Sequence, residues 1–447
     1  MENFDYNKEP LRDILFIDVK SFYATVECAA RGLNPLTTLL VVMSQADNAG
    51  NGLILASSPK AKEALHISNV TRADNLPSHP DLHIVPPRMQ KYIEENLKLN
   101  QLFQTFVAEE DLLIYSIDES ILDVTASLAL FFPHNISRQQ KRWQMARLIQ
   151  RTAYQKLGLI LTVGIGDNPL LAKLALDNAA KHRKQHHYIA EWRYQDIPET
   201  IWRIPNLTDF WGIGERTKRR LYRIGIDTVE QLAHANVELL RQRYGIIGEQ
   251  LYHHANGIDR TILSEDAPAV KEQSYSNSQI LPKDYTNIRD IKIVIGEMAE
   301  QVASRIRRHG CLTQRIQLQL RSAHCDLDKR FSHQLTIQAT NQTDTLKRHC
   351  FELFERYYQG QAIRQVSLSY SKLLYTNQRQ LSLFEEPEKQ LAKERLDHVI
   401  DLIRERYGFT SIIHATSKLD GARSIARSHL ISGHDGGAGG LDGLSKK

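Results

Sequence analysis

The stretch LLIYSIDESILDVT, residues 112–125, places two adjacent carboxylates, Asp118 and Glu119, between two short apolar runs. Apolar runs on either side of a polar centre predict a β-hairpin or a bent strand. Neighbouring negative charges in a half-buried strand are unfavourable unless a cation or another polar partner compensates them. Asp118 and Glu119 therefore require a compensating partner, and the rest of the sequence has to indicate which.

A second segment, DILFIDVKSFYATVE at residues 13–27, supplies a candidate partner because its apolar run ends at Asp18. A single Asp at a strand end is usually a helix cap. If the two segments pair in one sheet, however, Asp18 converges with Asp118 and Glu119, and divalent cations are needed to offset the charge. Oxygen ligands without His or Cys favour Mg²⁺, with Mn²⁺ as a substitute, over Zn²⁺. Two such ions about 4 Å apart are suited to phosphoryl transfer.

The composition indicates a globular protein of two to four domains, with 447 residues of which 42% are hydrophobic. No apolar run approaches the roughly 20 residues that span a bilayer, and the acidic N-terminus, MENFDYNKEPLRD, lacks the apolar core of a signal peptide. We therefore expect no membrane association and a cytoplasmic location. The four cysteines form no CxxC pair and are interpreted as reduced structural thiols.

Charge is distributed unevenly along the chain. Residues 1–130 carry 10 Lys and Arg against 18 Asp and Glu, residues 131–190 carry 10 against 2, and residues 271–376 carry 16 against 10. Separate acidic and basic blocks suit metal ions held beside a polyanion, although a binding protein without catalytic activity can show the same pattern by chance.

The first half of the chain reads as an α+β region. Strands are predicted at 14–19, 160–165 and near 187–190, with a helix over 168–181, and their order fits a palm-like sheet as well as a doubly wound one. The pattern becomes helical over 198–264, and a linker follows.

The segment after the linker predicts a β-α-β-β-α-β ferredoxin-like unit. Its expected strands are 274–281, 312–321, 331–339 and 363–373, and its expected helices are 286–309 and 342–359. In one strand, Ile316 and Leu318 alternate with polar residues that include Arg315 and Arg321. The polar face is either an ordinary solvated sheet face, which is the preferred interpretation of this segment alone, or a surface for a sugar-phosphate backbone.

Two glycine-containing stretches in the helical region resemble helix-hairpin-helix elements, WGIGERTKRRLYRIG at 211–225 and YGIIGEQLYHHANGID at 244–259. Gly212 and Gly214 allow backbone N–H groups to approach a phosphate, and Lys218 and Arg219 add electrostatic attraction. A single GxG before a helix is more often only a turn, but two elements in tandem favour DNA binding.

Together, DVKSFYATVE, YSIDES, VGIGDNPLLAKLALDNAAK, the helix-hairpin-helix pair and the ferredoxin-like unit resemble the Y-family DNA polymerases. The similarity covers about residues 11–425 and is greatest to the UmuC-like branch of Gram-positive bacteria. It implies a multidomain α+β right hand. The expected parts are a palm (1–22 and 86–190), fingers (23–85), a thumb (191–264), a little finger (271–376) and a C-terminal tail (377–447).

The resemblance also implies roles for individual residues. Asp18, Asp118 and Glu119 match the metal-binding carboxylates, Asp118 and Glu119 also being catalytic, and the carbonyl of Val19 matches a further metal ligand. Lys20, where some family members have Asp or Asn, is not at a ligand position.

Other positions match the family's nucleotide-binding residues. Tyr23 stands at the steric gate, which excludes ribonucleotides, and Phe22 matches an aromatic of the nucleotide pocket. Lys62, in SSPKAK, and Lys181 match basic residues that contact the triphosphate. Pro59 departs from the phosphate-binding Tyr of many relatives.

The tail contains QLSLF at residues 380–384, which resembles the bacterial motif that binds the sliding clamp through Gln380, Leu381, Leu383 and Phe384. The alternative is an apolar patch that packs on the little finger. An amphipathic helix is predicted over 389–406.

Three functions are weighed. The first is a template-directed DNA polymerase that joins dNTPs to a primer on template DNA, lacks a proofreading exonuclease and acts in damage tolerance and the SOS response. A UmuD-like subunit or a recombinase filament is a further partner in some relatives. The second, a nucleotidyl cyclase, leaves the helix-hairpin-helix elements unexplained. The third, a non-catalytic DNA-binding scaffold, leaves the intact carboxylates unexplained. The sequence favours the polymerase.

Overall fold

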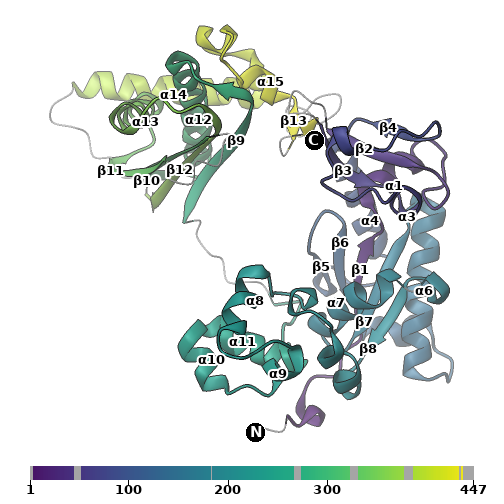
Figure 1. The fold of residues 1–447 in the computed structure, drawn as a ribbon. Helices are drawn as coiled ribbons and strands as arrows, with labels where there is room; N and C mark the ends of the chain where they lie inside the picture. The colour runs from purple at the N-terminus through teal and green to yellow at the C-terminus, as the bar shows by residue number, and fades with distance from the viewer. Residues whose placement is uncertain are drawn as a thin grey trace. The chain divides into compact units, whose positions relative to one another are not determined.

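The computed structural model describes residues 4–44, 52–182, 184–265, 273–322, 331–376, 386–431 and 434–435 (Figure 1). The chain divides into two compact units, one of residues 1–40, 57–64 and 92–268, and one of residues 41–56, 65–91 and 269–447. No helix within the described ranges is long and apolar enough to cross a membrane. The predicted boundaries between palm, fingers, thumb, little finger and tail stay predictions.

A five-stranded sheet forms the centre of the first unit, in the order β5-β6-β1-β7-β8. Its strands are β1 (Ile14–Val19), β5 (Leu112–Ile114), β6 (Glu119–Asp123), β7 (Leu161–Gly166) and β8 (Ile189–Trp192). Every residue of β1 is buried, and β1 pairs antiparallel with both β6 and β7. β5 and β6 are antiparallel neighbours, so the hairpin predicted for residues 112–125 is confirmed.

Two glycines of β7 bring a helix unusually close to this sheet. α7 (Pro169–Asn178) packs on β7, β1 and β8, and α6 (Arg138–Leu157) packs on β7. A Cβ added at Gly164 would lie 2.0 Å from the carbonyl oxygen of Ala172, and one at Gly166 would lie 2.3 Å from the Ala172 nitrogen. Only glycine permits this approach, which brings the side chains of α7 next to the end of β1.

The end of α7 corrects the sequence prediction, which continued this helix to Lys181. The helix stops at Asn178, whose side-chain amide donates to the carbonyls of Leu174 and Asp209. Ala179 then leaves helical geometry, with φ −131° and ψ −57°, and Lys181 lies in a 3-10 turn, Ala180–His182. The helix thus ends where a tertiary hydrogen bond is made, although the alanines that follow favour helix.

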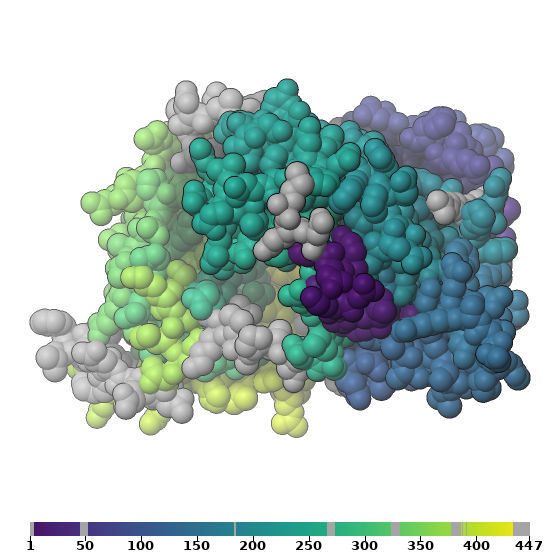
Figure 2. Space-filling view, turned by 90° about the horizontal axis from the view of Figure 1, so that it is seen from below, coloured from purple at the N-terminus to yellow at the C-terminus, as the bar shows by residue number. Residues whose placement is uncertain are grey.

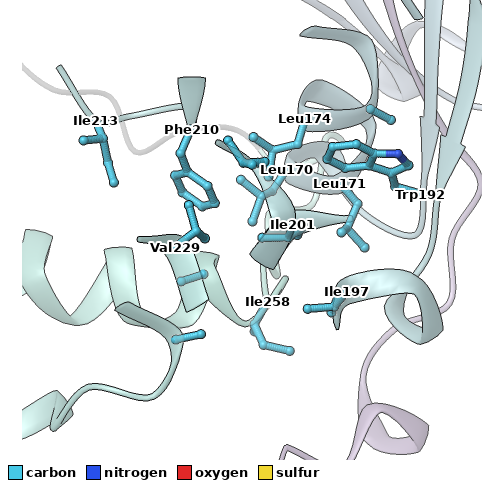
Figure 3. Close-up of a cluster of buried hydrophobic side chains, with 14 of the residues drawn as sticks. Leu170, Leu171, Leu174, Trp192, Ile197, Ile201, Phe210, Ile213, Val229 and Ile258 are labelled. Atoms are coloured by element: carbon cyan, nitrogen blue, oxygen red, sulfur yellow. The ribbon is translucent and has the colours of Figure 1, made fainter. Parts of the chain in front are cut away.

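The other face of α7 packs on the helical region, whose helices are α8 (Glu215–Tyr222), α9 (Val229–Ala233), α10 (Val237–Tyr244) and α11 (Ile246–Ala255). Figure 3 shows the buried cluster that joins them, with Leu170 and Leu174 of α7 near Phe210, and Val229 of α9 in the same cluster. The N-terminal segment, purple in Figure 2, also lies against this region. The Tyr6 hydroxyl donates to the carbonyl of Asn256 (3.1 Å).

The first 131 residues also contain a second sheet and further helices. A three-stranded sheet has the order β3-β2-β4. The elements are α1 (Phe22–Ala29), β2 (Leu40–Ser44), β3 (Leu53–Ser57), α3 (Pro59–Leu65), β4 (His83–Val85), α4 (Met89–Phe103) and α5 (Ser127–Phe131).

The predicted β-α-β-β-α-β unit is confirmed. It consists of β9 (Ser274–Tyr285), α12 (Ile288–Arg308), β10 (Cys311–Ser322), β11 (Phe331–Thr340), α13 (Thr343–Tyr357) and β12 (Ile363–Tyr375). All neighbouring strands are antiparallel, in the order β11-β10-β12-β9. Ile316 and Leu318 are fully buried in the core between sheet and helices, whereas Arg321 is exposed, as the alternation predicts.

A C-terminal segment packs on this unit through charged and polar groups. It contains α14 (Pro387–Tyr407), α15 (Ser424–Ser428), β13 (Leu430–Ile431) and β14 (His434–Asp435). Asp401 of α14 accepts from Arg307 (2.6 Å), Arg404 pairs with Glu300 (2.8 Å), and Glu297 accepts from the Ser424 hydroxyl (2.7 Å).

The exposed side of α14 is mixed in character. Leu396, Val399 and Leu402 are 60%, 49% and 50% exposed, and Arg395 and Arg406 on the same helix are exposed as well. The side that faces the domain is charged, through Asp397, Asp401 and Arg404. The helix predicted over 389–406 is therefore present, but it does not bury an apolar side against the domain.

Candidate active site

The strand pairing of β1 and β6 brings three carboxylates together. Asp18 lies directly opposite Glu119, and the N–H of Val19 donates to the carbonyl of Asp118 (2.9 Å). The Ser116 hydroxyl orients Asp118 by donating to its Oδ1 (2.7 Å). The predicted pairing of the two segments is thus confirmed, and residues 100 positions apart form one acidic group.

Burial dominates the electrostatics of Asp18, which is 9% exposed. Desolvation raises the pKa of its carboxyl to about 6, Lys181 opposes this rise, and the charges of Asp118 and Glu119 add to it. The three acids are therefore close enough to repel one another, which favours a bound cation.

Two lysines from the α7 region neutralise the acidic group. Lys181 Nζ lies 2.6 Å from Asp18 Oδ2 and 2.9 Å from Asp177 Oδ1. Burial alone would lower the pKa of Lys181, but Asp18 and Asp177 outweigh it and raise that pKa. Lys173 Nζ lies 2.5 Å from Glu119 Oε1 and 3.2 Å from Asp177 Oδ2.

Sequence reasoning gave Lys173 no role. Its only signal is a lysine inside the apolar run of LAKLALDNAAK, and its side chain is almost completely buried. A buried lysine requires a charged partner, so this position could have been singled out, but nothing local identifies Glu119 as that partner.

Lys62, on α3, is also part of this electrostatic environment. Burial lowers the pKa of Lys62, with Asp18 acting against the change and Lys181 acting with it. Lys62 and Lys181, the two lysines predicted to contact a triphosphate, thus both interact electrostatically with Asp18.

The aromatic residues lie on the helix that follows β1. Tyr23 is in the first turn of α1, and burial, followed by the charge of Asp118, raises the pKa of its hydroxyl. Its ring stacks on Tyr92 of α4, with centroids 4.5 Å apart and an angle of 16°. Phe22 beside it is buried.

Tyr92, which the sequence interpretation did not include, holds this stack in place. It is completely buried and donates from its hydroxyl to Glu27 Oε1 (2.8 Å). Glu27 is one helical turn after Tyr23 on α1 and also pairs with Arg31. The orientation of the Tyr23 ring is therefore fixed by Tyr92, on which it stacks.

The predicted metal ligands are oxygen donors, as Mg²⁺ requires. Within the described ranges, however, no three acidic, His or Cys side chains are arranged ready to hold a metal. The acids instead face the Lys173 and Lys181 ammonium groups, which supply the compensating positive charge. The donor chemistry fits divalent cations, and the ligand roles of Asp18, Asp118, Glu119 and the Val19 carbonyl all stay predictions.

The predicted DNA-contacting glycines introduce α8. Gly212 has φ +94°, a left-handed conformation that favours glycine, and Gly214 is the N-cap residue of α8. Lys218 and Arg219 follow on this helix, Arg219 exposed. The second glycine stretch differs from the first, because the turn is at Gly245 (φ +65°) and Gly248 lies inside α11.

The other two predicted DNA contacts belong to the second unit. Arg315 is half-buried and Arg321 exposed on β10. All of these DNA contacts stay predictions. The clamp-binding motif Gln380–Phe384 lies outside the described residues.

Carboxylates grouped at the end of a central antiparallel strand, with lysines opposite them, are the arrangement that the sequence predicts for a nucleotidyltransferase. Residues 17–177 match the impB/mucB/samB family, and residues 272–383 match the C-terminal domain of that family. The chain belongs to this family, the Y-family DNA polymerases, and is a DNA-directed DNA polymerase.

Individual relatives agree with this assignment. UvrX of Bacillus subtilis (strain 168), a protein named for UV-damage repair, is 40% identical over 433 residues, 96% of this chain and 99% of that protein. DNA polymerase IV 2 of the same organism is 31% identical over 427 residues, 94% and 98% of the two chains. A solved Y-family DNA polymerase chimera has a TM-score of 0.61 at 18% identity, covering 81% of this chain and 100% of its own, and shares the fold.

Proposed function

We propose that this polymerase copies damaged DNA by adding nucleotides from dNTPs to a primer 3′-hydroxyl with two divalent metal ions, as part of damage tolerance and the SOS response. The observation that carries the proposal is the register of β1 and β6, which sets Asp18 opposite Glu119 with Asp118 adjacent. Mg²⁺, or Mn²⁺ in its place, would be held by these carboxylates and the Val19 carbonyl. Such ions activate an attacking oxygen and stabilise a leaving one.

The protein's own groups prepare this chemistry. Lys181 and Lys62 would bind the triphosphate. This role is supported for Lys181 by its ion pair with Asp18, beside which the reacting phosphate would be bound, and Lys62 interacts electrostatically with the same carboxylate. Lys173 fixes the orientation of Glu119 through a buried ion pair. Asp177 accepts from both Lys173 and Lys181, so it can retain their charges within the site when the carboxylates bind another cation.

Two alternatives are less well supported. A nucleotidyl cyclase does not use the Gly212 and Gly214 turn that introduces the basic helix α8. A non-catalytic DNA-binding scaffold does not require the buried contact between Lys173 and Glu119.

Primer extension by the purified chain on undamaged and lesion-containing templates tests the proposal. We expect incorporation opposite the lesion with Mg²⁺ and dNTPs, and none when the divalent cations are chelated. No extension on either template, with or without a UmuD-like subunit and a recombinase filament, would contradict the polymerase assignment. Extension by the chain alone would exclude an absolute need for those partners.

Because chromosomal DNA would be the substrate, we propose that the enzyme acts in the cytoplasm.

The tail is proposed to bind the bacterial sliding clamp through Gln380, Leu381, Leu383 and Phe384. Apolar anchors of this kind often dominate the binding energy of an interface. Replacing Leu383 and Phe384 with Ala should leave synthesis without a clamp intact and remove stimulation by a loaded clamp. A matched control replaces Leu391 and Leu396, two exposed apolar residues of α14, with Ala. Equal stimulation of the tail variant and the wild type would exclude this motif from clamp binding.

A further inference from the structure

Lys20 lies at the end of the strand that carries Asp18, and its backbone is fixed on both sides. Its N–H donates to the carbonyl of Ile160 (2.8 Å), and its carbonyl accepts from the Thr25 hydroxyl (2.6 Å). The side chain therefore extends from an anchored point. Neither the sequence interpretation nor the proposed mechanism gives this lysine a role.

The Lys20 ammonium contacts both ends of the loop that contains Lys181. It donates to the main-chain carbonyl of Lys181 (3.3 Å) and lies 4.3 Å from the centre of the Tyr188 ring. The loop leaves α7 after Asn178 and enters β8 at Ile189. One side chain thus bridges the end of β1 and a loop that begins about 160 residues later.

The far end of this loop is conformationally strained. His187 and Tyr188 have φ values of +55° and +60°, a left-handed conformation that residues with side chains rarely adopt. Gln150 donates to the His187 carbonyl (2.9 Å), and the Val163 N–H donates to the Tyr188 carbonyl (2.9 Å). These bonds, together with the Lys20 cation on the Tyr188 ring, hold His187 and Tyr188 in this conformation.

We propose that Lys20 is a positioning residue that acts through Lys181. To bind a nucleotide, the Lys181 side chain must turn from Asp18 and Asp177 towards the triphosphate, and its end point depends on where its backbone is held. Lys20 fixes the backbone of Lys181 relative to Asp18, because Lys20 directly follows β1, the strand that carries Asp18. Some family members have a carboxylate at the position of Lys20. At neutral pH a carboxylate has no proton to donate to the Lys181 carbonyl, so it cannot make this contact. The inference rests on the proposed polymerase function.

The test compares steady-state kcat and KM for a dNTP in wild type, Lys20→Met and Lys20→Arg. Lys20→Met should raise KM for the dNTP about tenfold and change kcat less than about threefold. The contact between Lys181 and the triphosphate is made equally in the bound substrate and in the transition state, so misplacing Lys181 weakens substrate binding without slowing the chemical step. Lys20→Arg should keep the wild-type KM, since a guanidinium also donates hydrogen bonds and packs on aromatic rings. Lys98→Met is the matched control, an exposed lysine paired with Glu95, and should behave as wild type.

A double-mutant cycle with Lys181 distinguishes positioning from a general structural role. If Lys20 acts through Lys181, adding Lys20→Met to a Lys181→Met variant should not raise KM further. Multiplicative effects, or an unchanged KM in Lys20→Met alone, would overturn the proposal.

Hydrogen exchange without DNA or dNTP gives a measurement independent of activity. In Lys20→Met, exchange should accelerate in the segment from Lys181 to Tyr188 and remain unchanged in β1 and β6. Equal acceleration throughout the sheet would indicate lost stability and contradict a local role. Absence of primer extension by the wild type, with and without a UmuD-like subunit and a recombinase filament, would refute the proposed function itself. A wild type that extends normally and an unaffected Lys20→Met would refute only this inference.

Discussion

Asp118→Asn is expected to abolish primer extension, with a rate loss of at least about a thousandfold, or ~4 kcal/mol of transition-state stabilisation. Asparagine preserves the shape of the side chain and retains the Oδ1 acceptor for the Ser116 hydroxyl, so the β5-β6 turn should persist. What it removes is one of three negative charges proposed to hold the divalent cations. Single-turnover extension at saturating dNTP and Mg²⁺ measures the loss.

DNA binding distinguishes lost chemistry from lost structure in this variant. Affinity for primer-template should persist or increase, because a negative charge that repels phosphates is gone. Asp111→Asn, at the far end of the same hairpin, is the matched control and should extend primers normally. Retained extension by Asp118→Asn would refute the two-metal assignment.

Tyr23→Ala is expected to weaken discrimination against ribonucleotides by roughly 10–100-fold. A 2′-hydroxyl forced against a fixed ring costs about 1–3 kcal/mol, in the range measured for overpacked sites. The Tyr23 ring is fixed because it stacks on Tyr92, which is itself held by Glu27. The measurement is the ratio of kcat/KM for matched deoxyribo- and ribonucleoside triphosphates.

Two further variants make this experiment specific to the ring. Tyr23→Phe retains the aromatic face and should keep the wild-type ratio. Tyr92→Phe retains the stacked ring but loses the hydroxyl bond to Glu27, so it should weaken discrimination less than Tyr23→Ala does. If Tyr23 were only a core aromatic, Tyr23→Ala would instead lower the free energy of unfolding by about 3–5 kcal/mol and reduce activity towards all nucleotides equally. An unchanged ratio would remove Tyr23 from the nucleotide site.

The features predicted correctly from sequence are those that a short pattern specifies. Alternation in the little finger indicates its strands because one face must be apolar, as Ile316 and Leu318 show. The convergence of Asp18 with Glu119 was predicted because each lies at the polar end of an apolar run, and antiparallel pairing then leaves few registers.

The features that were missed depend on contacts between distant segments. Lys173 lies in an ordinary apolar helix and becomes part of the site only through Gly164 and Gly166, which let α7 approach the sheet. The strand predicted near 187–190 begins at Ile189, because residues 187 and 188 adopt positive φ under tertiary restraint. Local periodicity contains no information about either contact.

The polar attachment of the C-terminal segment separates its folding from that of the domain it covers. Among the described residues, the apolar core of the β-α-β-β-α-β unit is formed by residues of that unit, from Tyr275 to Tyr370, and includes none from α14 or α15. Arg307, Glu300 and Glu297 would become hydrated surface residues if the segment were detached. Detachment of the segment would therefore break ion pairs and hydrogen bonds but leave that apolar core intact.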